Sequence, residues 1–303
     1  MSTMNAASRP RAKGPIVWLD MDQQELDDAY DQRVYAPNQE QIHQRRDFCN
    51  AIAREMLGPP QKLRYGAGAM ETIDLYRTKT PNAPVNIYIH GGAWKSGTAA
   101  KVAYMAETFV RAGAHFAALD FNNVLETDGD LFPMVDQVRR AVAWIYHNAA
   151  SFGGDPGRLY VTGHSSGGHL AGCVVITDWT EYGLSENPLK GALLGSGMYD
   201  LKAPRLSKRS QYVKFTDAME QALSPQRHVD RIAIPIVITY GTLETPEFQR
   251  QTRDFHAALK AAGKDVRLVA GPSYNHFETH ETMGNPYGFM GRAALEMMGL
   301  APA

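Results

Sequence analysis

The chain has 303 residues, 44% of them hydrophobic, which is enough for one large α/β domain or two small ones with a sizeable core. Its 31 basic and 32 acidic residues leave a formal net charge of −1, so the composition favours no nucleic-acid partner. No run approaches the roughly 18 apolar residues of a membrane helix, the polar start lacks a secretory signal, and two distant cysteines predict free thiols. We therefore expect a cytoplasmic protein with no membrane partner.

The chain opens with a polar segment, residues 1–20, that is expected to be disordered. Residues 21–60 carry helical patterning with many charges, and Pro37 divides them into helices expected over 22–30 and 39–56. This pattern fits a lid over the mouth of an active site. It fits equally well a helical layer packed on the outside of the molecule.

Residues 61–303 form the second part of the chain, in which β-rich runs alternate with amphipathic helices. An antiparallel pair of strands is expected to open it, and the alternation that follows predicts a mostly parallel sheet between two helical layers. The expected strands lie at 63–65, 72–76, 85–89, 115–121, 159–162, 191–196, 234–240 and 266–270, and the expected helices at 101–112, 133–152, 166–177, 247–262 and from about 288.

Residues 199–229 interrupt the alternation and contain two prolines and several charges. An insertion between two late strands lies above the carboxyl ends of the strands, where open α/β sheets form their sites. We therefore predict a cap over a substrate pocket. The basic pair Lys208-Arg209 inside this insertion is expected on a solvated face.

The segment 163–167, Gly-His-Ser-Ser-Gly, runs from a β-branched strand into a helix. A serine on such a sharp turn exposes its hydroxyl at the start of a helix, which makes Ser165 a candidate nucleophile. The backbone N–H of Ser166 can then stabilise an oxyanion. A second glycine motif, His-Gly-Gly-Ala-Trp at 90–94, also follows a strand, and the N–H groups of Gly92 and Ala93 are expected to complete the oxyanion hole. Taken alone, that motif would also fit a plain tight turn.

A serine nucleophile needs a base and an acid, and in this arrangement the chain order is serine, acid, histidine. Glu244 lies in the turn after the penultimate strand, and we prefer it to Glu247, whose place at a helix start the helix dipole explains. His276 lies in the loop after the last strand and is preferred to His280, four residues on.

Several residues beside these motifs are candidates for the substrate pocket. An aromatic wall suits a flat or aromatic substrate, although Trp94 fits a plain core residue equally well. His164 lies inside the sharp turn and could shape it. The candidates are Trp94, His164, Tyr30, Tyr199 and Phe277.

These motifs resemble the α/β-hydrolase superfamily, and within it the branch with His-Gly-Gly, which includes hormone-sensitive-lipase-like esterases and kynurenine formamidases (arylformamidases). The second group is the more similar, over roughly residues 60 to 300. The resemblance rests on His-Gly-Gly-Ala-Trp at 90–94, Gly-His-Ser-Ser-Gly-Gly-His-Leu at 163–170, Ser-Gly-Met-Tyr-Asp-Leu at 196–201 with Ser-Pro at 224–225, and Thr-Pro-Glu-Phe-Gln-Arg-Gln at 245–251.

The resemblance implies the α/β-hydrolase fold, with about eight strands, and carries the nucleophile to Ser165 and the base to His276. The acid falls on Glu244, where the family usually has aspartate, and Ser166 stands where it usually has alanine. The implied reaction is hydrolysis of a formamide-type amide or an ester of a small aryl substrate through an acyl-enzyme, with N-formylkynurenine as the type substrate and no metal or organic cofactor. Family habit also suggests a homodimer.

Two other functions stay open at this point. A carboxylesterase, or a xenobiotic aryl-amidase or carbamate hydrolase, would differ from a formamidase only in the pocket. A binding protein that has kept the fold is disfavoured because Ser165, Glu244 and His276 are all intact.

Overall fold

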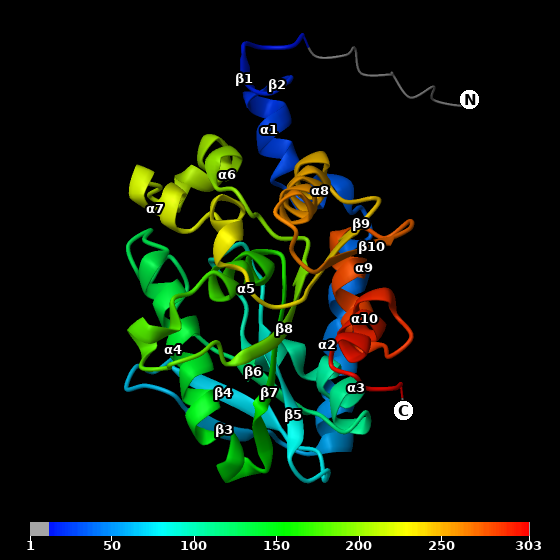
Figure 1. Cartoon of the computed structure of the whole chain (residues 1–303). Helices are drawn as coiled ribbons and strands as arrows, with labels where there is room; N and C mark the ends of the chain where they lie inside the picture. Colours follow the sequence, from blue (N-terminus) through cyan, green and yellow to red (C-terminus); the bar gives the residue numbers. More distant parts are fainter. Residues whose placement is uncertain (1–11, 303) are drawn as a thin grey trace, which may run out of the picture.

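The computed structural model describes residues 12–302, and eight of its strands form one central sheet (Figure 1). These strands are β3 Gln61–Arg64, β4 Thr72–Tyr76, β5 Ala83–Ile89, β6 His115–Leu119, β7 Gly154–His164, β8 Leu189–Gly195, β9 Ile236–Gly241 and β10 Val266–Gly271. They lie in the order β10-β9-β8-β7-β5-β6-β4-β3. The β3–β4 and β4–β6 pairs are antiparallel and every other pair is parallel, which confirms the predicted sheet.

Helices cover both faces of this sheet, so the sheet is the middle of three layers (Figure 1). The α-helices are α1 Gln23–Ala29, α2 Gln39–Leu57, α3 Ala106–Arg111, α4 Phe132–Asn148, α5 Ser166–Val175, α6 Lys202–Leu206, α7 Asp217–Ala222, α8 Pro246–Ala261, α9 His276–Glu281 and α10 Phe289–Met297. Successive side chains of a strand point to opposite faces. Accordingly, Ile87 of β5 packs in the core with α4, α5 and α8, and Tyr88 packs in a second core with α3 and α10.

Two predicted helices are shorter than expected, because part of each is a 3-10 helix. Residues 101–112 divide into η2 Ala99–Met105 and α3, and α4 ends at Asn148 before η3 Ala149–Phe152. A helix also begins where a loop was predicted, because Asn275 caps α9 and pairs with Glu278 in a capping box. Within residues 12–302, no helix is both long and apolar enough to cross a membrane.

The N-terminal extension contains a small hairpin in addition to the two predicted helices. The prediction of disorder over residues 1–20 is wrong for β1 Ile16–Trp18, which pairs with β2 Met21–Asp22; residues 1–11 lie outside the described residues. Asp22 then caps α1 in a capping box with Glu25, which explains why the helix starts there. The 3-10 helix η1 Gln32–Tyr35 links α1 to α2.

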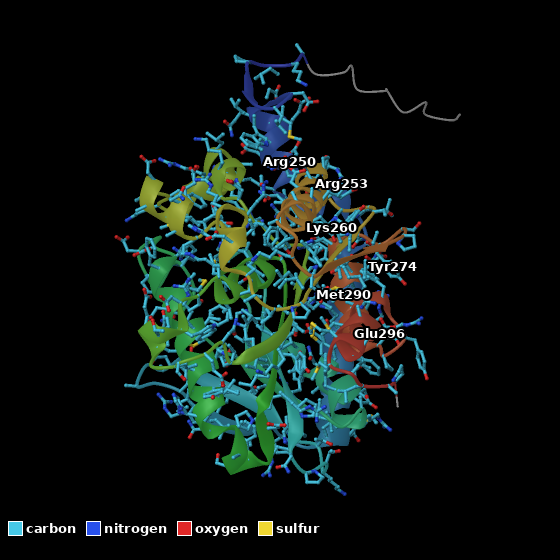
Figure 2. The ribbon with its side chains drawn as sticks, viewed as in Figure 1. Arg250, Arg253, Lys260, Tyr274, Met290 and Glu296 are labelled. Carbon is cyan, nitrogen blue, oxygen red and sulfur yellow. The ribbon has the colours of Figure 1, made fainter. Side chains whose placement is uncertain are left out.

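A buried glutamate on α8 fastens this extension to the domain. Glu247 is 0% exposed and accepts hydrogen bonds from the Trp18 indole at 3.1 Å and the Tyr30 hydroxyl at 3.0 Å. Arg250, one turn along α8, pairs with both carboxylate oxygens at 2.6 and 2.8 Å, and its guanidinium lies 5.3 Å from the centre of the Trp18 ring. Figure 2 labels Arg250 at the end of α8 nearest α1. Every polar atom of the carboxylate therefore has a partner.

The cap lies between β8 and β9 and borders the extension. It contains α6, the 3-10 helix η5 Lys208–Gln211, α7 and the 3-10 helix η6 Pro225–Arg231. Gln23 of α1 donates to the Leu206 carbonyl at 2.9 Å, and the Lys208 amide donates to Asp27 at 2.6 Å. The cap and the extension thus meet above the carboxyl ends of the strands.

We expect Glu247→Gln to lower the free energy of unfolding by roughly 2–4 kcal/mol, because it removes the buried carboxylate from Arg250 and leaves the guanidinium only the more exposed Asp254. Urea unfolding followed by circular dichroism measures the change. Glu186→Gln, at an exposed position, is the control and should change the stability by less than about 0.5 kcal/mol. A loss equally small for Glu247→Gln would contradict the anchoring role.

Candidate active site

The register of the parallel strands brings the two glycine motifs to one edge of the sheet. Ile89 of β5 pairs with Gly163 of β7, and His164 at the end of β7 pairs with Gly195 of β8. The loops that leave these strands therefore start side by side. The Ser165 amide donates to the Gly195 carbonyl at 2.9 Å and holds the turn against β8.

Ser165 occupies a strained backbone conformation, with φ of 61° and ψ of −129°, between the end of β7 and the start of α5. A non-glycine residue with positive φ is uncommon and marks a local constraint. Two glycines make the turn sterically possible: a Cβ on Gly163 would lie 2.3 Å from the Gly167 carbonyl oxygen, and one on Gly167 would lie 2.1 Å from the Ile89 carbonyl oxygen. The sharp turn predicted for residues 163–167 is therefore present.

The second glycine motif forms a tight loop beside Ser165. Gly92, Ala93 and Trp94 have φ values of 125°, 56° and 63°. A Cβ on Gly92 would lie 2.1 Å from the Ser96 carbonyl oxygen, so only glycine fits there. The Trp94 amide donates to the Ser166 hydroxyl at 3.1 Å, which ties the loop to the start of α5. Among residues 12–302, no acceptor takes the Gly92 or Ala93 amide proton, so both remain available to a ligand oxygen.

An acid and a histidine pair at the same edge. The Nδ1–H of His276, at the start of α9, donates to Oε2 of Glu244 at 2.9 Å, and the side chains are 4% and 0% exposed. The other oxygen, Oε1, accepts from the Ser196 hydroxyl at 2.6 Å and the Gly241 amide at 2.8 Å. This leaves Nε2 of His276 free to act on a neighbour, and His276 and Ser165 line the same cavity.

The supporting role of Ser196 was not predicted. This residue follows β8 with a φ of 45°, and its amide donates to the Thr239 carbonyl at 2.8 Å. The strained turn aims its hydroxyl at Glu244. A Ser-Gly pair directly after a late strand was the only sequence sign of this turn.

The alternative acid and base have other partners. Glu247 is held by Trp18, Tyr30 and Arg250, as described above. Nδ1 of His280 lies 2.8 Å from Arg46, which can only donate, so this nitrogen accepts and Nε2–H faces the Tyr88 hydroxyl at 2.7 Å. Burial lowers the pKa of His280 well below the ordinary value, which keeps the ring neutral.

A cavity of about 720 Å³ opens onto Ser165 and is walled by the glycine loop, the N-terminal extension and the cap. Of the predicted pocket residues, Tyr30, His164 and Phe277 line it. The His164 ring lies 4.4 Å from that of His276, and burial lowers the pKa of His164 well below its usual value. The extension thus forms part of the wall, while its opening and closing as a lid stays a prediction.

Trp94 and Tyr199 are not among the described residues that line the cavity, contrary to the prediction. Trp94 turns inward, is 2% exposed and packs edge-on against Phe215. Tyr199 is fully buried against Phe255, and its hydroxyl accepts from the Gly197 amide at 3.1 Å. Both residues support the loops that carry the site instead of walling it.

The predicted solvated face for Lys208-Arg209 is also wrong at Arg209. Its side chain is 4% exposed and lies at the cavity wall, over the rings of Tyr30 and Trp94. Lys208 also lines the cavity and pairs with Asp31 at 2.7 Å. The pair therefore faces inward because the N-terminal extension covers it.

Three side chains of the site also have the spacing of metal ligands. One ligand atom from each of His164, Glu244 and His276 lies within 4.8 Å of the others. The partners described above already account for both Glu244 oxygens. The expectation that the site works without a metal stays a prediction.

Comparison with known proteins agrees with this geometry. The BD-FAE family matches residues 73–188. Kynurenine formamidases of Danio rerio and Salmo salar are 28% and 29% identical, each over 93% of this chain and 98% of theirs. The esterase LipW of Mycobacterium marinum superposes with a TM-score of 0.68 at 19% identity, over 88% of each chain. An esterase of Thermogutta terrifontis superposes at 0.67 and 21%, over 82% of this chain and 97% of its own.

The chain has the α/β-hydrolase fold. It is a hydrolase enzyme similar to kynurenine formamidases along nearly its whole length, and this confirms the predicted fold and enzyme class.

In this hydrolase, a buried histidine on α5 fixes the ring of Trp94. The indole N–H donates to Nδ1 of His169 at 3.1 Å, so Nε2 carries the proton and donates to the Leu223 carbonyl at 2.8 Å. Burial lowers the pKa of His169 to about 4. The ring therefore connects the glycine loop to the cap in one neutral tautomer.

We expect the stability of the hydrolase to fall as the pH drops from 6.5 toward 4. In this range the unfolded chain protonates His169, whose ordinary pKa is 6.5, while the folded protein does not until about pH 4. This group alone contributes a slope of about 1.4 kcal/mol per pH unit. Urea unfolding at several pH values should therefore show a shallower dependence for His169→Gln than for the wild type. Equal slopes would show that His169 is not held neutral.

Proposed function

We propose that the chain is a serine hydrolase that cleaves a formamide-type amide or an ester of a small aryl substrate. The kynurenine formamidases and esterases among its relatives support hydrolysis of amide or ester bonds. The observation that carries the serine mechanism is the buried hydrogen bond from His276 to Glu244, because His276 lines the same cavity as a serine on a strained turn. A serine hydroxyl needs such a base to become nucleophilic.

In this mechanism, Nε2 of His276 takes the proton of Ser165 as the hydroxyl attacks the substrate carbonyl. Glu244 holds the ring in the tautomer that leaves Nε2 unprotonated, and its negative charge stabilises the imidazolium that forms. The amides of Gly92, Ala93 and Ser166 then donate to the tetrahedral oxyanion, where the loss of one donor typically raises the barrier by roughly 3–4 kcal/mol.

Collapse of this intermediate releases the amine or alcohol, which takes a proton from His276. Water then attacks the acyl-enzyme by the same steps and frees Ser165. The chemistry proposed here uses no metal or organic cofactor. Cytoplasmic location and a homodimer stay predictions.

The alternative is a carboxylesterase, or a xenobiotic aryl-amidase or carbamate hydrolase, with the same machinery. The cavity of about 720 Å³ is large enough for a substrate of drug size. A formamidase and a carboxylesterase would differ in the space beside the reacting carbonyl carbon, because a formamidase needs room there only for a hydrogen.

We expect N-formylkynurenine to be hydrolysed with a kcat/KM in the usual enzyme range of about 10⁴–10⁸ M⁻¹s⁻¹. In a series of nitrophenyl esters, the rate should fall beyond the shortest acyl group. Steady-state kinetics on both substrates measure this. Poor turnover of the formamide with good activity on longer acyl esters would favour the carboxylesterase instead.

Ser165→Ala is the test of the nucleophile within the same assay. It should lower kcat at least about a thousandfold while substrate still binds. Ser151→Ala, an exposed serine at the opposite end of β7, is the matched control. Robust activity in Ser165→Ala would overturn the serine mechanism.

The two neighbouring glutamates offer a test of the acid. Glu244→Gln should lower kcat about a thousandfold or more, because an amide cannot stabilise the imidazolium and can reverse the tautomer of His276. Glu247→Gln makes the same chemical change in an equally buried place that does not touch His276, and kcat should stay within about threefold. Both rates are measured well below the unfolding temperature of each variant. The reverse order would transfer the role to Glu247.

A further inference from the structure

The cavity wall is strongly positive, although the whole chain has a net charge of −1. Among the described residues that line it, six are cationic and two are anionic. The cations are Arg33, Arg46, Lys95, Lys101, Lys208 and Arg209, and the anions are Asp31 and Asp47. A cleft with one sign of charge raises the local concentration of ligands of the opposite sign.

Three of these cations form ion pairs within the protein, with two carboxylates between them. Asp31 accepts from Arg33 and from Lys208, both at 2.7 Å, and Asp47 accepts from Lys101 at 2.9 Å. Within residues 12–302, the remaining three have no carboxylate within 4.0 Å. These are Arg46, Lys95 and Arg209. Arg46 is partly buried and donates to the neutral ring of His280, and its Nε has no partner among the described residues.

Arg209 is the most deeply buried of the three. Its guanidinium lies 5.4 Å from the centre of the Trp94 ring and 5.6 Å from that of Tyr30. It donates to the Tyr212 hydroxyl at 2.8 Å and to the Tyr30 carbonyl at 3.4 Å, while its Nε is buried with no partner among residues 12–302. Burial of a charge without a counter-charge is unfavourable. A buried guanidinium that has no carboxylate partner in the described part of the chain, at the wall of this cavity, thus points to a ligand that supplies the counter-charge.

Lys95 lies beside Tyr212, which also contacts Arg209. Its ammonium is 4.6 Å from the centre of the Tyr212 ring, whose hydroxyl accepts from Arg209. Lys95 also follows directly on the loop of residues 90–94 that reaches Ser165. Lys95 and Arg209 therefore both contact Tyr212, where the cap and the glycine loop border the cavity.

We propose that Arg209, with Lys95 beside it, binds a carboxylate of the substrate and selects anionic substrates over neutral ones of the same shape. The planar guanidinium matches the geometry of a carboxylate, and the ammonium adds a point charge. This inference rests on the proposed function. It adds that the amide or ester carries an anionic group on the part of the molecule that lies under the cap.

Matched substrates test the selection. The three formamidobenzoates (ortho, meta and para) are compared with the corresponding formamidobenzamides, which have the same shape and no charge. For at least one position, the wild type should prefer the carboxylate at least tenfold in kcat/KM, mainly through KM, and the preference should shrink as salt is added. Arg209→Gln should bring the ratio to within about threefold of one, and Arg209→Lys should restore part of it.

Arg33→Gln is the control, because Arg33 lines the same cavity but already pairs with Asp31. This variant should keep the wild-type ratio within about threefold. A wild-type ratio near one at all three positions would overturn the carboxylate site, as would an unchanged ratio in a folded Arg209→Gln.

A second measurement needs only the wild type and decides the question if Arg209→Gln does not fold. Benzoate should bind at least tenfold more tightly than benzamide, as measured by calorimetry. Equal binding would overturn the proposal. If the wild type hydrolyses neither formamides nor nitrophenyl esters, the proposed function fails, and the comparison of benzoate with benzamide still tells whether the anion site exists.

Discussion

The hydrogen-bonding register between β5, β7 and β8 is the constraint on which the site depends. Because Ile89 pairs with Gly163 and His164 with Gly195, three loops leave the sheet at one level. A shift by one residue would reverse the face of every side chain on the shifted strand. The glycines in these loops then allow backbone to approach backbone at distances that a Cβ would prevent. The geometry around Ser165 is therefore a property of the sheet as much as of the motif.

Two glutamates three positions apart have different tasks because each has its own complete set of partners. Glu244 lies in the turn after β9 and accepts hydrogen bonds from Ser196, Gly241 and His276. Glu247 lies on α8 and turns to the extension. A buried carboxylate is tolerated when its oxygens are satisfied, and here neither residue depends on the partners of the other. Glu244 can thus act in the proposed reaction while Glu247 holds the N-terminal extension on the domain.

The sheet, the sharp turn at Ser165 and the pairing of Glu244 with His276 could be predicted because their signals are local or lie in chain order. The direction of Trp94 could not, since it depends on His169 and the cap, which are distant in sequence. The burial of Arg209 likewise depends on an aromatic ring from the N-terminal extension. By contrast, the start of α9 was readable in the capping pair Asn275 and Glu278.

Tyr30 helps to fasten the N-terminal extension to the domain and also lines the cavity. Its hydroxyl donates to Glu247, and its ring lies under the guanidinium of Arg209 at the cavity wall. The terminal extension of a domain is often dispensable, because the core folds without it. Here the extension has a further role, since the loops of the sheet carry the proposed reacting groups while residues of the extension line the same cavity. Changes in this part of the chain can therefore alter substrate preference without touching Ser165, Glu244 or His276.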